Sequence, residues 1–292
     1  MRSGLSELAA GRAYVDASGW RTIAVAGRDA ARWLNDLASA DLSGLEPGRA
    51  RPSLLLSPTG GVLASFVVTI TDEGYLLTQD PDQRSVGELL GRYVLSSDVR
   101  LDDRTGAWTI LAFPGRGEPL QVPDASWSSP TCLGGDNGGD LWSAAGERDR
   151  LRAALGDPPA ASDADAETWR VLTAVPKLGV DTADSDLPHE CGLASAVSFD
   201  KGCYLGQEAV ARSRSLGRPR RLVEAVEADR AIAPGEPLFA GDEEAGVVTS
   251  ATSVDGHHLA IARIGWAHRD AAWTTPAGAQ VTRRAGTGQD QA

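Results

Sequence analysis

The chain is organised around the residues Asp200-Lys201-Gly202-Cys203-Tyr204-Leu205-Gly206-Gln207-Glu208-Ala209-Val210-Ala211-Arg212. Two glycines flank a cysteine and a tyrosine, and helix-forming residues begin at Gln207. Because glycine tolerates positive φ and close backbone approach, we predict a tight loop that delivers Cys203 to the start of a short helix. Unpaired N–H groups at a helix start, with Lys201 nearby, would favour an anion or a thiolate. In the alternative interpretation Cys203 is a small buried residue in a turn.

Composition bounds the class of protein. With 292 residues and 42% hydrophobic residues, the chain can bury large cores and is expected to form two or three globular domains. A formal net charge of -12 argues against a broad surface for nucleic acid or acidic membranes. Three widely spaced cysteines without a CxxC pair suit reduced thiols in the cytoplasm. Neither a signal peptide nor a membrane span is expected.

The first third of the chain alternates short apolar runs with turn residues. We predict strands at 21–25, 53–56, 62–70, 75–78, 99–101 and 108–113, with a hairpin turn at 58–61. A helix capped by Asp29 should carry Trp33, Leu34 and Leu37, and residues 83–95 read as a second amphipathic helix. Antiparallel hairpins mixed with helices indicate an α+β domain.

The remainder divides by composition. Residues 114–140 show little periodicity, and helices are predicted at 148–155 and 166–174. Short strands with turns from Leu222 onward suit a small β-barrel or sandwich, followed by a frayed tail from Arg283. We therefore expect an N-terminal α+β domain at 1–113, a second α+β domain carrying the Cys203 stretch at 114–217, and a C-terminal β-barrel domain at 218–292.

Several kinds of site lack support. No dinucleotide or P-loop glycine motif and no GxSxG nucleophile turn is present. His189, Cys191 and Cys203 could be metal ligands in principle, but their spacing does not favour it, and we expect no metal.

Glu190 lies in the loop Leu187-Pro188-His189-Glu190 before an apolar run. A half-buried carboxylate can accept two parallel N–H bonds from a flat heterocycle such as a pterin or a guanine. A solvated loop glutamate is the alternative.

Five arginines crowd ten residues after the Cys203 stretch: Arg212, Arg214, Arg218, Arg220 and Arg221. They could hold a carboxylate-bearing tail or RNA phosphates, or form a solvated linker between domains.

The octapeptide Lys201-Gly202-Cys203-Tyr204-Leu205-Gly206-Gln207-Glu208 is similar to the K-G-C-Y-x-G-Q-E signature of the YgfZ family, relatives of the glycine-cleavage T-protein. The resemblance extends over most of the chain. It includes the segments 27–30, 45–48, 57–60, 91–93, 176–181 and 187–190, and the element Gly246-Val247-Val248-Thr249-Ser250.

The resemblance implies a ring of three domains with a tetrahydrofolate or other reduced-folate site near its centre. It also implies a role in assembling or repairing iron–sulfur proteins, with indirect effects on tRNA modification, and hence partners among the iron–sulfur machinery or its clients. By position, Glu190 would hold the pterin edge and Cys203 would be the functional thiol. The other signature positions that would belong to the site are Lys201, Tyr204, Gln207 and Arg212.

One departure concerns catalysis. Where T-proteins carry paired aspartates after a Gly-Gly turn, this chain has Ala64 and Ser65 after Gly60-Gly61. A carboxylate for proton transfer at the folate amine is missing, so T-protein-type aminomethyl transfer is not expected. Folate-dependent one-carbon transfer or demethylation with another acid–base group stays open, as do RNA interaction through the arginines and a chain that has lost folate binding.

Overall fold

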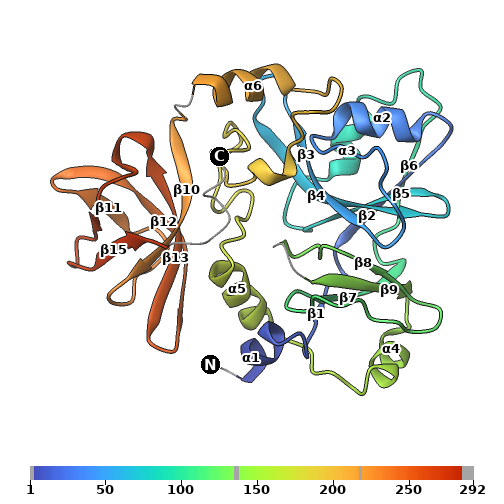
Figure 1. The fold of residues 1–292 in the computed structure, drawn as a ribbon, viewed down its shortest axis with the longest axis horizontal. Coiled ribbons are helices and arrows are strands. Elements are labelled where there is room, and N and C mark those ends of the chain that lie inside the picture. Colours follow the sequence, from blue (N-terminus) through green and yellow to red (C-terminus); the bar gives the residue numbers. More distant parts are fainter. Residues whose placement is uncertain (1–2, 135–137, 217–218, 285–292) are drawn as a thin grey trace.

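A computed structural model describes residues 3–134, 138–216 and 219–284, and Figure 1 shows its arrangement. The helices are α1 (Ser3–Ala9), α2 (Ala30–Leu37), α3 (Val86–Gly91), α4 (Arg148–Ala154), α5 (Asp163–Leu172) and α6 (Gln207–Leu216), with short 3-10 turns at Ala194–Ala196 and Trp266–His268. The strands before the barrel are β1 (Val15–Asp16), β2 (Arg21–Ala26), β3 (Ala50–Leu56), β4 (Val62–Thr71), β5 (Gly74–Gln79), β6 (Arg100–Asp103), β7 (Trp108–Phe113), β8 (Ser126–Ser128) and β9 (Gly139–Ala144). The fold is α+β, as the sequence predicts.

Five antiparallel strands form the first sheet, in the order β3-β4-β5-β2-β6. Alternate residues of these strands point to one face of the sheet, and this face is apolar. Its side chains, among them Leu55, Phe66 and Leu77, pack against α2 and α3. Helix α2 supplies Trp33, Leu34 and Leu37 to this core, as its periodicity predicts. The strands predicted at 21–25, 53–56, 62–70 and 75–78 and the hairpin at 58–61 are confirmed here. The strand predicted at 99–101 corresponds to β6, and the one at 108–113 is β7 of the second sheet.

Two local predictions about the helices beside this sheet need correction. Asp29 is the N-cap residue of α2, as predicted, but its side chain makes no capping hydrogen bond, and its carboxylate instead accepts the backbone N–H of Asp98 at 2.7 Å. The helix predicted at 83–95 is only α3, because Ser85 caps it and Gln83 turns its side chain to the backbone N–H of Ser65, at 2.9 Å.

A second, four-stranded sheet has the order β1-β7-β9-β8. Strand β7 pairs with β9 from Trp108–Ala144 to Phe113–Gly139, so the predicted boundary after Phe113 runs through this sheet. The prediction that residues 114–140 lack regular structure missed β8 and the start of β9. The reason is that the glycine, proline and aspartate content of that stretch hides two short strands.

Helix α6 and the loop before it lie on the first sheet rather than on the second. Tyr204 and Val210 share a buried cluster with Leu54 and Leu56 of β3 and Val62 of β4. The signature stretch therefore belongs to the core of the N-terminal sheet, although the sequence predicts it within the second domain.

The C-terminal part is a closed six-stranded barrel, in the order β10-β13-β12-β11-β14-β15, which confirms the predicted barrel (Figure 1). Its strands are β10 (Arg221–Ala228), β11 (Pro237–Ala240), β12 (Glu243–Val254), β13 (His257–Gly265), β14 (Trp273–Thr274) and β15 (Gln280–Arg283). Arg283 ends β15, and the rest of the tail predicted to be frayed lies, from residue 285, outside the described residues. Among the helices of the described residues, none is long and apolar enough to cross a membrane.

Candidate functional site

Lys201 fastens the signature loop to the end of α2. Its Nζ donates to three backbone carbonyls, of Asn35 at 2.5 Å, Ala38 at 2.9 Å and Ala40 at 2.7 Å. All three ammonium N–H groups are therefore used. Burial lowers the pKa of Lys201 to about 8, against the opposing effect of Asp41 and Asp36. Lys201 thus holds the loop in place by satisfying the carbonyls that a helix end leaves free.

Cys203 is exposed and lies four residues before the first residue of α6. The prediction that it stands at the helix start is wrong, because Gly206 with φ 81° turns the chain between them. A Cβ added at Gly206 would lie 2.5 Å from the carbonyl oxygen of Ser57 and 3.0 Å from Leu56. Only glycine allows this approach, which joins two segments of the family resemblance, the 57–60 turn and the signature.

Tyr204 is 6% exposed in the cluster between α6 and the first sheet. Within the described residues its hydroxyl has no hydrogen-bond partner. Burial raises the pKa of this phenol. An unpaired buried hydroxyl costs about 1–3 kcal/mol, so Tyr204 is not optimised for stability alone.

Glu190 is 1% exposed, and its carboxylate is engaged by backbone groups. Oε2 accepts the N–H of Leu187 at 2.9 Å, and Oε1 accepts the N–H of Arg220 at 2.7 Å. The Arg220 guanidinium stands 3.8 Å from Oε1. Glu190 therefore ties its own loop to the start of the barrel. Neither of the two described cavities is lined by Glu190 or by Cys203.

The remaining signature positions lie on α6. Gln207 begins the helix, and its backbone N–H donates to the carbonyl of Tyr204 at 3.2 Å. Arg212 is exposed and pairs with Glu208 at 2.6 Å, one turn away. Such an exposed pair contributes less than about 1 kcal/mol.

The other arginines of the cluster have separate roles. Arg221 lies 4.0 Å from the buried carboxylate of Asp186, as Arg220 lies near Glu190. Arg214 stacks on the ring of Phe199 at 4.1 Å. Arg218 lies outside the described residues. The cluster is therefore not a uniform solvated linker.

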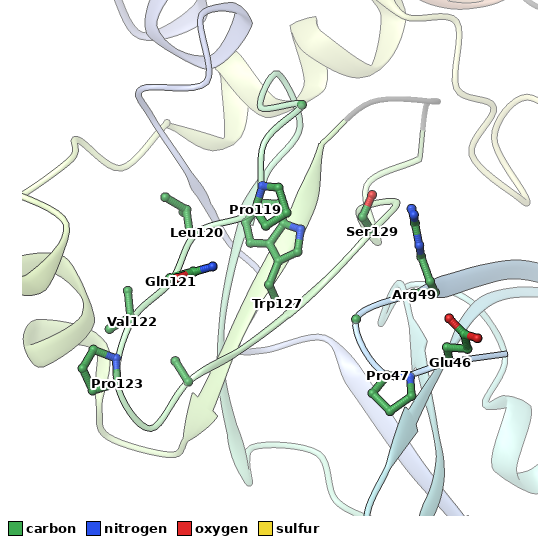
Figure 2. Close-up of a pocket in the computed structure, with 13 residues that line it drawn as sticks. Glu46, Pro47, Arg49, Pro119, Leu120, Gln121, Val122, Pro123, Trp127 and Ser129 are labelled. Atoms are coloured by element: carbon green, nitrogen blue, oxygen red, sulfur yellow. The ribbon is translucent and has the colours of Figure 1, made fainter.

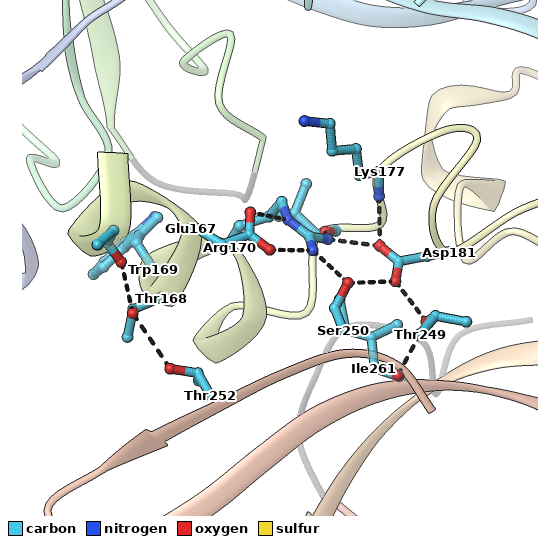
Figure 3. Close-up of polar contacts among 12 residues, drawn as sticks. Glu167, Thr168, Trp169, Arg170, Lys177, Asp181, Thr249, Ser250, Thr252 and Ile261 are labelled. Carbon is cyan, nitrogen blue, oxygen red and sulfur yellow. Dashed lines mark hydrogen bonds and ion pairs between the residues drawn. The ribbon is translucent and has the colours of Figure 1, made fainter. Parts of the chain in front are cut away.

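A buried ionic network joins the barrel to the segment before the signature (Figure 3). Asp181 is fully buried; its Oδ2 accepts from Arg170 at 2.6 Å and from the N–H of Lys177 at 2.8 Å. Its Oδ1 accepts the hydroxyls of Thr249 at 2.5 Å and Ser250 at 2.7 Å. Burial disfavours the charge of Arg170, but Glu167 and Asp181 outweigh this and raise its pKa.

The sequence indicates the segments 176–181 and 246–250 separately, but it does not show that their side chains hydrogen-bond to each other. The signal available was an aspartate and two hydroxyl residues, each within a segment of the family resemblance.

Two cavities are described. The larger, about 910 Å³, lies between the turn carrying Glu46, Pro47 and Arg49 and the segment from Pro119 to Trp127 (Figure 2). The smaller, about 450 Å³, adjoins the signature loop, and Asp200 and Arg214 are among its lining residues.

The position of the missing aspartates is on β4. Ala64 is fully buried in the core beneath α2, and Ser65 is partly buried with its backbone N–H held by Gln83. Within the described residues no group of three or more His, Cys, Asp or Glu side chains is placed to hold a metal ion.

Residues 6–116 match the family described as the GCVT N-terminal domain. Over 97% of its length the chain superimposes, with a TM-score of 0.79 and 19% identity, on 88% of the glycine cleavage system aminomethyltransferase T from Bartonella henselae. The fold of this chain is therefore similar to that of the T-protein.

The relatives of known sequence that this chain matches are distant. An aminomethyltransferase of Rubrobacter xylanophilus is 28% identical over 265 residues, which cover 81% of this chain and 71% of that protein. An uncharacterized protein of Haemophilus influenzae is 25% identical over 260 residues, covering 83% and 85%. The structural comparison shows the fold, and residues 6–116 are similar to the GCVT N-terminal domain.

Proposed function

We propose that this T-protein-like chain binds tetrahydrofolate or another reduced folate and supports the assembly or repair of iron–sulfur proteins, with indirect effects on tRNA modification. The observation that carries the proposal is the combination of a nearly complete T-protein-like fold with Ala64 and Ser65 at the position of the paired aspartates. The YgfZ-like octapeptide at 201–208 supports the iron–sulfur role.

Glu190 would anchor the pterin only if its loop opened, because the residue is 1% exposed and lines neither described cavity. Each of its oxygens accepts one backbone N–H, and a carboxylate oxygen has a second lone pair for another donor. The two parallel N–H groups of a pterin edge would use these remaining positions. The backbone bonds already fix the plane of the carboxylate, which reduces the ordering cost of binding. We infer from the signature that four further residues belong to the folate site: Lys201, Tyr204, Gln207 and Arg212.

The test of folate binding is calorimetric titration with tetrahydrofolate under anaerobic conditions. Glu190→Gln keeps the shape of the side chain and should weaken binding by at least about tenfold, the loss expected for a hydrogen-bonded charge. Asp186→Asn is the control, because it also removes a buried carboxylate charge beside the barrel. Equal losses in both variants would show that Glu190 acts only on the structure.

Cys203 is the residue through which we propose the iron–sulfur role. Because its side chain is exposed, Cys203→Ala should fold normally and bind folate with nearly unchanged affinity. It should fail to restore iron–sulfur enzyme activity in a strain deleted for its own relative of this protein. Full rescue by Cys203→Ala would overturn the assignment of the thiol.

The second candidate is folate-dependent one-carbon transfer or demethylation, which the names of the aminomethyltransferase relatives favour. Incubation with a methylated amine and tetrahydrofolate should then yield methylenetetrahydrofolate. Absence of that product at enzyme concentrations comparable to substrate would exclude it. RNA binding is disfavoured by the net charge of -12 and by the pairing of Arg212 with Glu208.

A further inference from the structure

The larger cavity, of about 910 Å³, lies where the first sheet meets the second, and the proposed function does not use it. One wall is the turn before β3, and the other is the segment that leads into β8 (Figure 2). Ser129 joins the two walls, because its N–H donates to the carbonyl of Gly48 at 3.3 Å and its carbonyl accepts the N–H of Ala50 at 2.7 Å. Cavities of this size between two structural units are common places for small ligands.

The wall beside β8 is largely apolar. The ring of Trp127 packs against that of Phe113, with centroids 6.3 Å apart, and it lies so close to Gly139 that a Cβ there would collide with it. These contacts fix the indole in place, and Pro119 and Leu120 add to the apolar surface of the cavity. A fixed aromatic ring beside apolar residues can bind an apolar group without first being ordered.

The opposite wall carries one charge of each sign. Among the described residues that line the cavity, Glu46 and Arg49 are the charged ones, and Figure 2 shows both across from Trp127. They belong to one turn, in which the N–H of Arg49 donates to the carbonyl of Glu46 at 3.0 Å. In the part of the chain that the structure describes, neither side chain forms a hydrogen bond or an ion pair. Both charges are therefore available to a ligand.

This arrangement selects the charge of the ligand. An anion would be attracted by Arg49 but repelled by Glu46, and a cation would meet the reverse. A zwitterion can place its ammonium on Glu46 and its carboxylate on Arg49 while an apolar side chain covers Trp127. We propose that this cavity binds a small zwitterion with an apolar or aromatic side chain. Two sources have this chemistry, a free amino acid and a dipeptide, and neither depends on the proposed folate function.

The experiment titrates the chain by calorimetry at low salt and neutral pH. The probes are L-phenylalanine, the dipeptide L-leucyl-L-phenylalanine, and the N-acetylated and the amidated form of each, which carry one charge only. The native chain is compared with Glu46→Gln and with Arg49→Gln. The controls Glu118→Gln and Arg51→Gln remove the same charges from exposed residues nearby that do not line this cavity. Thermal unfolding shows that each variant is folded.

The native chain should bind a zwitterion more tightly than either of its singly charged forms. Glu46→Gln should weaken the zwitterion by about fivefold and remove its advantage over the N-acetylated form, and Arg49→Gln should remove its advantage over the amide. Tighter binding of L-phenylalanine identifies a free amino acid as the ligand, and tighter binding of L-leucyl-L-phenylalanine identifies a dipeptide. The proposal is overturned if no probe binds at millimolar concentration, if the singly charged forms bind equally well, or if the controls lose as much affinity.

Discussion

Arg170 offers a comparison between two carboxylates that bind the same guanidinium. Asp181 is fully buried at 2.6 Å from it, whereas Glu167 is 53% exposed at 2.7 Å. Replacing Asp181 by alanine leaves a buried cation with one partner fewer and strands the N–H of Lys177 and the hydroxyl proton of Ser250. Breaking a buried pair of this kind costs about 3–5 kcal/mol.

Glu167→Ala removes an ion pair of nearly the same length from the same arginine. Because water screens and replaces that interaction, the loss should be no more than about 1 kcal/mol. Both free energies of unfolding are measured by urea denaturation followed by circular dichroism, with the slope on urea compared between variants. Losses that agree within about 1 kcal/mol would refute the reasoning, because burial would then not decide the strength of the network.

Three further predictions concern the loop and the second sheet. Gly206→Ala should destabilise the protein by at least about 2 kcal/mol in the same urea assay, because φ is 81° and the new Cβ would meet the Ser57 carbonyl at 2.5 Å; a loss under 0.5 kcal/mol would show that the turn adapts. Lys201 has a folded pKa of about 8, below its unfolded value, so the unfolded chain binds more protons between pH 8 and 10. The stability of the native chain relative to Lys201→Met should therefore rise with pH over that range, and a flat difference would contradict it. Burial raises the pKa of Asp140 to about 6, so its contribution is present below pH 4 and is lost as pH rises through 6. Relative to Asp140→Asn, the native chain should lose up to about 3 kcal/mol between pH 4 and pH 7 in thermal or urea unfolding, and a constant difference would count against this.

The parts of the fold that the sequence predicts well are those with strong local patterns. The sequence predicts the strands β2 to β5, the turn at 58–61 and the apolar face of α2. In strands and helices the direction of each side chain repeats every two or 3.6 residues, so the apolar pattern shows which side is buried. Strand β8 is not readable, because three residues carry too little pattern and acquire their role from pairing with β9.

The site residues divide in the same way. The turn at Gly206 could be predicted, because its positive φ is a conformation that glycine adopts far more readily than other residues. The three carbonyl contacts of Lys201 were not, since they join residues more than 160 positions apart. Nor could the sequence show that Arg214 would stack on Phe199 while its neighbours pair with acids.

The cluster of Leu54, Leu56 and Val62 with Tyr204 and Val210 has a consequence during synthesis on the ribosome. The five strands of the first sheet have all been made once Asp103 has been added, but the residues that cover this apolar face follow roughly 100 positions later. At a translation rate of about 5–20 residues per second, this apolar face stays uncovered for roughly 5–20 seconds until the covering residues are synthesised. A nascent chain stalled in that interval presents a ready surface for chaperones, and slower translation lengthens the exposure.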